Sequence, residues 1–322
     1  MQKLIKWTLS AAVCLSLLPT QALAARQVIP VGKVVGLQLQ NDCVSVAAFD
    51  EELGSCAKAA GLQIGDEITC IDGIAVDDAE DVRTALQQSH GRIQMTILRN
   101  AKEHKVCLTP EITAQGPRLG IYLRQGITGI GTVTWYDPAT GNFGALGHGV
   151  NDTKGELAQM SAGHAYSAGV MSVKKGKQGQ PGQLRGGIAD TTPLGSLQKN
   201  THQGVFGKTE IGWEGQAVEV ATAKEITAGP ATIYSTVSGE GVQSYSVEIL
   251  KIYPNSQKEG RNMLLRVTDP TLLQTTGGIV QGMSGSPIIQ DGKLVGAVTH
   301  VLVNDPTTGY GIFIENMLDA AA

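Results

Sequence analysis

The chain has 322 residues, of which 42% are hydrophobic, 17% are charged and 41 are glycine. Glycine at nearly twice its ordinary share of ~7%, with no Gly-X-Y period and only 12 prolines, excludes collagen and a Pro-rich disordered tract. It argues against long helical bundles and favours tight turns between short strands. A formal net charge of −4 without a basic stripe speaks against nucleic-acid binding, and the length predicts two domains.

The first 24 residues have the layout of a secretory signal. Lys3 and Lys6 precede an apolar run at 7–18, and Ala22-Leu23-Ala24 follows as a cleavage-site pattern. The alternative is an uncleaved anchor, but a spanning helix needs ~20 apolar residues. We therefore expect residues 1–24 to direct export, and removing their two lysines changes the formal charge from −4 to −6. No other long apolar run exists, so the remainder is predicted to be soluble.

The cysteines lie in the first third of the chain. Beyond Cys14 in the signal, the four are Cys43, Cys56, Cys70 and Cys107. In an exported chain they could form two disulfides in any of three connectivities, and buried thiols are the equal alternative. They show no CxxC or other metal-ligand spacing, and none follows position 107, so the second domain cannot be a thiol enzyme. Neither a metal nor another cofactor is predicted.

Residues 28–108 alternate between strand and short helix patterns. Strands are predicted at 34–39, 44–47, 67–71, 74–76 and 92–98, and helices at 56–60 and from Asp77 or Asp78 to about Ser89. Val82, Ala85 and Leu86 fall on one face of the second helix.

This pattern resembles a bacterial PDZ domain, most clearly in Ala-Lys-Ala-Ala-Gly-Leu-Gln-Ile-Gly-Asp-Glu-Ile at 57–68 and Ile-Asp-Gly-Ile-Ala-Val at 71–76. The resemblance implies a peptide-binding domain over residues 25–110, which adds a peptide as an extra strand and holds its terminal carboxylate in backbone amides. By the same resemblance, the cradle and groove residues are Val35, Gly36, Leu37, Val82 and Leu86. Peptide termini are the implied ligands.

From residue 115 to 322 the pattern becomes one of short strands and turns. Candidate strands are 130–136, 168–173, 217–221, 231–237, 244–253, 263–267, 286–289 and 293–299, with no convincing helix before 315–321. Such a segment suits a double barrel or a large sandwich.

A serine flanked by glycines stands out near the end, in Gly-Met-Ser-Gly-Ser-Pro at 282–287. Acyl transfer needs a projecting hydroxyl and backbone amides aimed at the developing oxyanion. The run resembles the nucleophile turn of chymotrypsin-like peptidases. We assign Ser284 as nucleophile, with its amide and that of Gly282 as the oxyanion hole; Ser286 is the rival.

A serine hydroxyl requires a base, and His148 has the most suggestive setting. It lies in Phe-Gly-Ala-Leu-Gly-His-Gly at 143–149, upstream of the serine as in the order His, Asp, Ser. The other histidines favour exposed or structurally satisfied positions. Among them, His300 is the most interesting because its strand follows the serine as a substrate-pairing strand does.

Four segments together resemble the stage IV sporulation protein B (SpoIVB) serine peptidases: 129–138, 143–149, 277–287 and 296–301. The resemblance implies a mainly-β, chymotrypsin-like double-barrel peptidase behind the α/β PDZ domain. It also implies a secreted serine endopeptidase of endospore-forming bacteria, released between forespore and mother cell. Its substrates would be itself and a membrane-associated regulator of an intramembrane protease, whose cleavage triggers sigma-factor activation. Contact with the membrane is then only indirect.

The third member of the triad is open from the residues alone, because Asp152, Asp190 and Asp305 are all available and chymotrypsin spacing favours Asp190. The family resemblance instead implies Asp269, in Val-Thr-Asp-Pro at 267–270. A different class of function is also open: a PDZ scaffold whose protease-like domain is inert.

Overall fold

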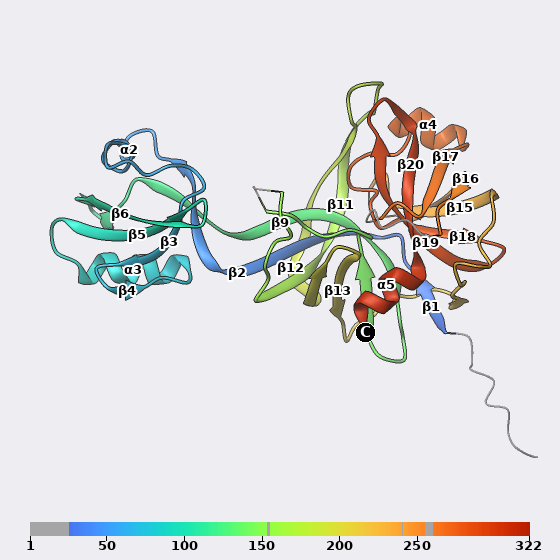
Figure 1. Cartoon of the computed structure of the whole chain (residues 1–322), viewed down its shortest axis with the longest axis horizontal. Coiled ribbons are helices and arrows are strands. Elements are labelled where there is room, and N and C mark those ends of the chain that lie inside the picture. Colours follow the sequence, from blue (N-terminus) through green and yellow to red (C-terminus); the bar gives the residue numbers. More distant parts are fainter. Residues whose placement is uncertain (1–25, 153–154, 240, 255–259) are drawn as a thin grey trace, which may run out of the picture.

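The protein, a computed structural model, is described over residues 26–152, 155–239, 241–254 and 260–322. The predicted signal at 1–24 lies outside these residues. Figure 1 shows a smaller body and a larger body joined by two long strands, β2 (Val34–Phe49) and β9 (Ile121–Tyr136). Among the described residues, every helix is too short or too polar to cross a membrane.

The smaller body is the PDZ-like part of the chain. Besides the outer portions of β2 and β9, its elements are α2 (Ser55–Ala59), β3 (Glu67–Ile71), β4 (Ile74–Ala75), α3 (Ala79–Gln88), β5 (Ile93–Arg99), β6 (Lys102–Leu108), β7 (Glu111–Thr113) and β8 (Gly116–Arg118). Asp78 begins α3 with a reciprocal capping box to Asp81, as the sequence predicts for a capped helix. Val82 and Leu86 on this helix are buried in the core of this body.

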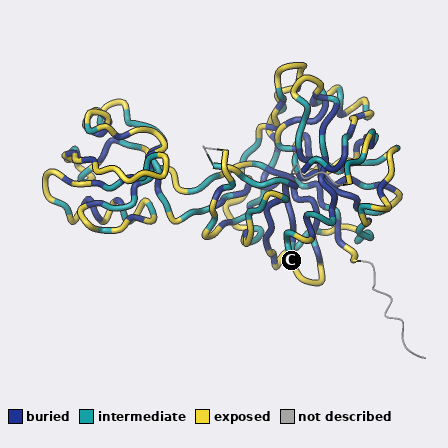
Figure 2. The backbone as a smooth tube through the Cα atoms, viewed as in Figure 1, coloured by how far each residue is buried: buried dark blue, intermediate teal, exposed yellow. Residues whose placement is uncertain are grey.

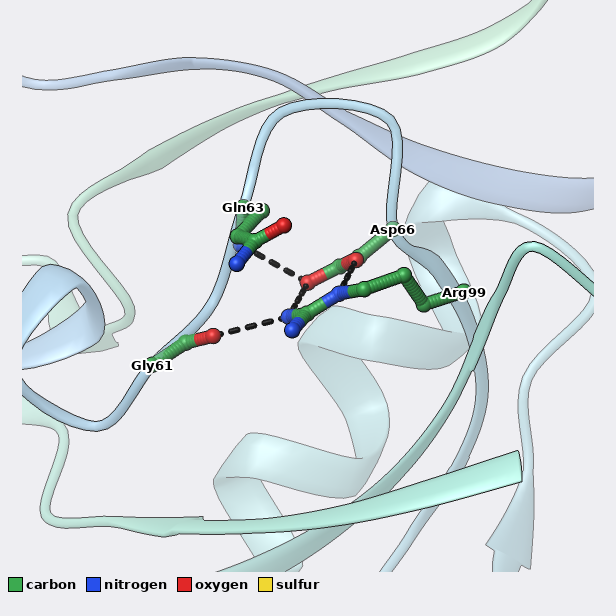
Figure 3. Close-up of polar contacts among 4 residues, drawn as sticks. All are labelled: Gly61, Gln63, Asp66 and Arg99. Atoms are coloured by element: carbon green, nitrogen blue, oxygen red, sulfur yellow. Dashed lines mark hydrogen bonds and ion pairs between the residues drawn. The ribbon is translucent and has the colours of Figure 1, made fainter. Parts of the chain in front are cut away.

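An ion pair between a buried carboxylate and a partly exposed guanidinium holds the Gly-Leu-x-x-Gly-Asp turn of the smaller body (Figure 3). Asp66 is 1% exposed and accepts bonds of 2.7 Å from both Nε and Nη2 of Arg99. The same carboxylate accepts from the Gln63 amide at 2.7 Å, while Arg99 also donates to the Gly61 carbonyl at 2.8 Å. Hydrogen bonds to both carboxylate oxygens compensate for the burial of Asp66, so they stabilise this conformation of the turn.

The larger body consists of two β-barrels. Its strands are β1 (Gln27–Pro30), β10 (Asn142–Ala145), β11 (Ala162–Lys174), β12 (Gln183–Thr201), β13 (Gly204–Lys208), β14 (Val218–Glu219), β15 (Gly229–Ser235), β16 (Gln243–Ile252), β17 (Met263–Val267), β18 (Pro287–Gln290), β19 (Lys293–Leu302) and β20 (Asp305–Phe313). The order β9-β10-β13-β12-β11-β2 closes on itself because β2 also pairs with β9. The second barrel closes in the order β15-β16-β17-β20-β19-β18. These barrels confirm the predicted mainly-β double barrel, and Figure 2 shows buried residues along their strands.

The boundary between the bodies differs from the predicted limits of the first domain. Residues 27–39 were predicted to belong to the PDZ domain, but β1 pairs with β9 and β14, and 35–39 of β2 lie between β9 and β11 of the first barrel. Only the distal part of β2, from Val44, pairs with β3 in the PDZ body. The alternating pattern is the same in both halves of β2, so it carries no signal of the passage from one body to the other.

Two helices occur in the larger body. The predicted C-terminal helix is present as α5 (Ile314–Ala321), whereas α4 (Pro270–Thr276) was not predicted. Asp269 caps α4, Pro270 occupies its first turn and Gly277 ends it at φ +77°. These are ordinary helix signals, but seven residues are too few to produce an amphipathic period.

The four cysteines beyond the signal form no disulfide in this structure. Of the two alternatives that the sequence leaves open, the structure has thiols, but they are not the buried thiols expected: three are half-buried and Cys107 is exposed. Cys43 accepts a hydrogen bond from Asn41, and Cys56 donates to Glu111.

Candidate active site

A cavity of about 530 Å³ contains the two residues predicted to do the chemistry. His148 reaches it from the loop after β10, and Ser284 from the turn before β18, so each barrel contributes one of them. The rest of the lining includes apolar side chains of β2 and β9, such as Leu37, Leu39 and Ile130. Among the described lining residues there is no Asp or Glu.

The turn around Ser284 requires its glycines. Gly285 adopts φ +96°, and a Cβ there would lie 2.0 Å from the Thr132 carbonyl oxygen. Gly282 adopts φ +99°. Ser286, the rival nucleophile, is fully buried, donates to the Ser235 hydroxyl at 3.0 Å and does not line the cavity, so Ser284 is the exposed hydroxyl of the pair.

Two backbone amides of this turn have no acceptor in the described part of the chain, and they belong to Gly282 and Ser284. The carbonyl oxygens of the same two peptide groups are hydrogen-bonded instead. Gln281 O accepts from the Leu184 amide at 2.8 Å, and Met283 O accepts from the Ser286 amide at 3.0 Å. The two amides that the sequence predicts for an oxyanion hole are therefore the two available donors of the turn.

His148 is held by its own backbone rather than by a carboxylate. Its Nδ1 lies 2.8 Å from the Gly149 carbonyl oxygen. A carbonyl can only accept, so Nδ1 carries the proton and Nε2 is the basic nitrogen. Burial lowers the pKa of the imidazole, although the bond to Gly149 opposes this. The ring is thus neutral near pH 7, as a general base must be.

Ser284 and His148 are not hydrogen-bonded to each other in the described structure. The Ser284 hydroxyl donates instead to the carbonyl oxygen of Thr299 at 2.7 Å. This bond engages the proton that a base would remove. In this arrangement the Ser284 proton is therefore bound by Thr299 O and not by His148.

His300 is a site residue whose role the sequence did not assign. Its ring lies 5.5 Å from the ring of His148, centroid to centroid, and lines the same cavity. Burial lowers the pKa of His300 to about 4, with smaller contributions from His148 and Arg261. Its Nδ1 is buried and has no partner among the described residues. Its place on the strand after the serine was the signal for it.

The structure does not bring Asp269 to His148. The Asp269 carboxylate caps α4, accepting from the amides of Leu272 at 3.0 Å and Ser246 at 3.4 Å, and it does not line the cavity. Asp190 is exposed on β12 and accepts from the Thr192 amide. Asp152 and Asp305 are also absent from the described lining.

The predicted carboxylate cradle at Val35, Gly36 and Leu37 is wrong. Strand pairing on both edges leaves these backbone groups no room for a peptide, because β11 lies on one side and β9 on the other. Leu37 and Val35 are buried in the core of the first barrel, whereas Val82 and Leu86 are buried in the PDZ body. At Gly36, a Cβ would lie 2.7 Å from the side chain of Ile188, so a larger residue there would displace this neighbour in the barrel.

An open strand edge exists elsewhere in the PDZ body. Residues 121–125 of β9 pair with β2 on one side, and no other described strand pairs with them. Ile121 and Leu123 pack against the core that contains Val82 and Leu86 of α3. Gly120, at φ +66°, leads into this edge. The sequence did not indicate this edge because residues 121–125 lie beyond residue 110, where the PDZ domain was predicted to end.

The sequence matches the model of the SpoIVB peptidase S55 family over residues 115–318 and that of a PDZ domain over residues 51–99. Among solved structures, the PDZ domain of the SdrC-like protein from Listeria monocytogenes covers 26% of this chain and 87% of its own, at 23% identity and TM-score 0.22. The inactive form of the Rv3671c protease of M. tuberculosis covers 61% of this chain and 85% of its own, at 14% identity and TM-score 0.34.

The double barrel, the glycine-framed serine and the histidine that shares its cavity define a serine peptidase that carries a PDZ domain. The family model spans more than half of the chain, and the chain belongs to the SpoIVB peptidase S55 family.

Proposed function

We propose that the protein is a serine endopeptidase in which Ser284 is the nucleophile and His148 the general base. The observation that carries the proposal is their presence, one from each barrel, in the same cavity. Rotation of Ser284 away from Thr299 O would present its hydroxyl to Nε2 of His148. The oxygen then attacks the scissile carbonyl carbon while its proton passes to Nε2, and the imidazolium returns that proton to the leaving amine. Water then hydrolyses the acyl-enzyme.

The amides of Gly282 and Ser284 are proposed to hold the oxyanion of the tetrahedral intermediate. They are unpaired donors in a turn whose other peptide groups are hydrogen-bonded, which is the preorganisation that oxyanion stabilisation needs. Their neighbour Thr299 accepts the resting serine hydroxyl through its carbonyl, a bond that must break on attack.

The PDZ body is proposed to bind a peptide terminus, of a substrate or of the protein itself, along the open edge of β9 at 121–125. The added strand would lie between this edge and α3, with the backbone around Gly120 receiving the carboxylate. The open edge and the apolar side chains of Ile121, Leu123, Val82 and Leu86 support this location.

Family membership also supports a finer role, which we propose on that basis: export, self-cleavage, and cleavage of a membrane-associated regulator of an intramembrane protease during sporulation. The residues at 1–24 have the signal layout that export requires. Amino-terminal sequencing of the product secreted by a spore-forming host reports export and self-cleavage together. A product that retains Met1 and appears only inside the cell would contradict both.

Labelling with a fluorophosphonate tests the enzyme directly. Attack by Ser284 forms the Oγ–phosphorus bond and expels fluoride, while the proton passes to His148. We expect the wild type and Ser286→Ala to be labelled and Ser284→Ala to be unlabelled. An unlabelled wild type that also leaves casein and itself intact on a gel would support the inert PDZ scaffold instead.

A further inference from the structure

Thr132 belongs to β9 of the first barrel but is hydrogen-bonded to the nucleophile turn before β18. Its side-chain hydroxyl donates to the Gly282 carbonyl oxygen at 2.9 Å, and its amide donates to the Ser284 carbonyl oxygen at 3.1 Å. Thr132 is completely buried. One residue of the first barrel therefore binds both residues whose amides are the free donors of the turn.

These two bonds complete the fixation of two peptide groups. In the peptide group that joins Gly282 to Met283, Thr132 binds the carbonyl oxygen. The amide of the same group, that of Met283, donates to Val280 O at 3.1 Å. In the peptide group that joins Ser284 to Gly285, Thr132 likewise binds the carbonyl oxygen, and the Gly285 amide donates to Val298 O at 2.7 Å. Because a peptide group is planar and rigid, holding both ends sets its orientation and constrains the direction of the amides beside it.

The same residue also contacts the loop that carries His148. The Thr132 carbonyl accepts from the Leu146 amide at 3.1 Å, two residues before the histidine. Leu146 has φ +70°, an uncommon conformation for a side chain of this size, which surrounding contacts must stabilise. The close approach of Gly285 to Thr132 O brings the two segments together at this point.

We propose that Thr132 is a positioning residue for catalysis: it orients the oxyanion amides of Gly282 and Ser284 and fixes the His148 loop against them. The proposal rests on the proposed function, and Thr132 itself touches no substrate. A valine would fit a buried strand equally well, so the hydroxyl matters through its bond to Gly282.

The chain offers a matched control two residues along the same strand. Thr134 is also completely buried, but its hydroxyl has no partner among the described residues. Thr132→Val and Thr134→Val therefore remove the same atoms from equally buried positions of β9. Only the first substitution removes a hydrogen bond to the nucleophile turn.

The test is the saturation kinetics of fluorophosphonate labelling on the full chain, together with thermal unfolding. For Thr132→Val we expect the maximal labelling rate to fall roughly 10- to 100-fold with little change in the half-saturating concentration, since misplacement by an ångström has costs of that order. Thr132→Ser, which keeps the donor, should restore the rate, and Thr134→Val should leave it unchanged within about twofold.

Equal maximal rates in Thr132→Val and Thr134→Val would overturn the proposal. So would a loss in Thr132→Val that serine fails to restore. If the valine variant does not fold, Thr132→Cys, a weak donor, must label more slowly than Thr132→Ser for the proposal to stand. If the wild type does not label at all, the proposed function fails and this inference fails with it. If the wild type labels but the Thr132 variants behave as the control does, only this inference fails.

Discussion

The PDZ body and the first barrel use the same two strands differently. In the barrel, residues 35–39 of β2 lie between two neighbours, and every strand of the ring is paired. In the PDZ body, β9 keeps the edge at 121–125 open. A closed barrel has no backbone groups left for a ligand, so its chemistry lies in loops and turns. An open edge can bind another main chain directly.

If the two bodies are separable, breaking the Asp66–Arg99 pair in one should spare the other. Asp66→Ala removes the hydrogen bonds to the partly exposed Arg99, and we expect a loss of about 1.5–3 kcal/mol in the stability of the PDZ body. Calorimetry should then show an early transition of the PDZ body, and fluorophosphonate labelling should persist at temperatures between this transition and the later one of the barrels. Glu80→Ala is the control, because its pair with Arg83 is exposed on both sides. A single transition at reduced temperature, with labelling lost, would show one cooperative unit.

The open edge can be tested by charge. Ile121→Asp places a carboxylate beside the proposed cradle, and we expect affinity for peptides with a free carboxyl terminus to fall about tenfold relative to Ile121→Asn, the uncharged variant of similar shape. Amidation of the peptides should remove this difference. Affinity measured by fluorescence anisotropy over a carboxyl-terminal peptide library provides the comparison. Equal affinities in the two variants would place the peptide elsewhere.

Substitutions at Asp269 test whether this residue caps a helix or takes part in catalysis. Because its carboxylate caps α4, we expect Asp269→Asn to keep both stability and labelling rate, since asparagine also caps helices well. Asp269→Ala should lose about 1 kcal/mol in urea unfolding. A fall of about 10⁴-fold in catalytic rate in the asparagine variant, with stability intact, would instead restore Asp269 as the triad acid. Asp190→Asn provides the matched control at the other candidate position.

The second barrel should also show a pH-dependent stability through His300, whose ring is largely withdrawn from water. The folded pKa is about 4, against an ordinary value near ~6.5. The unfolded chain therefore binds this proton first, so stability is full above about pH 6.5 and declines as the pH falls toward 4. His300→Gln should flatten urea midpoints measured across this window. An unchanged slope in His300→Gln would contradict the assignment.

Local patterns were sufficient for the features that depend on neighbours in sequence. Residues 67–71 and 263–267 form the predicted strands, α3 begins at the predicted cap, and the turn at 282–287 has the shape that its glycines require. The short glycine-framed segments around His148 and Ser284 marked both residues in the sequence, but their meeting in one cavity depends on the packing of the two barrels.

The sequence by itself determined the β-rich class, the PDZ and peptidase parts, and the serine and histidine to examine. Only the tertiary structure decided which edges were paired. It moved Val35, Gly36 and Leu37 into a barrel, left 121–125 open, placed His300 beside His148 and used Asp269 as a helix cap. The physical reason is that strand pairing joins residues far apart in the chain. A strand's alternating pattern records which side chains are buried but not which backbone lies beside it.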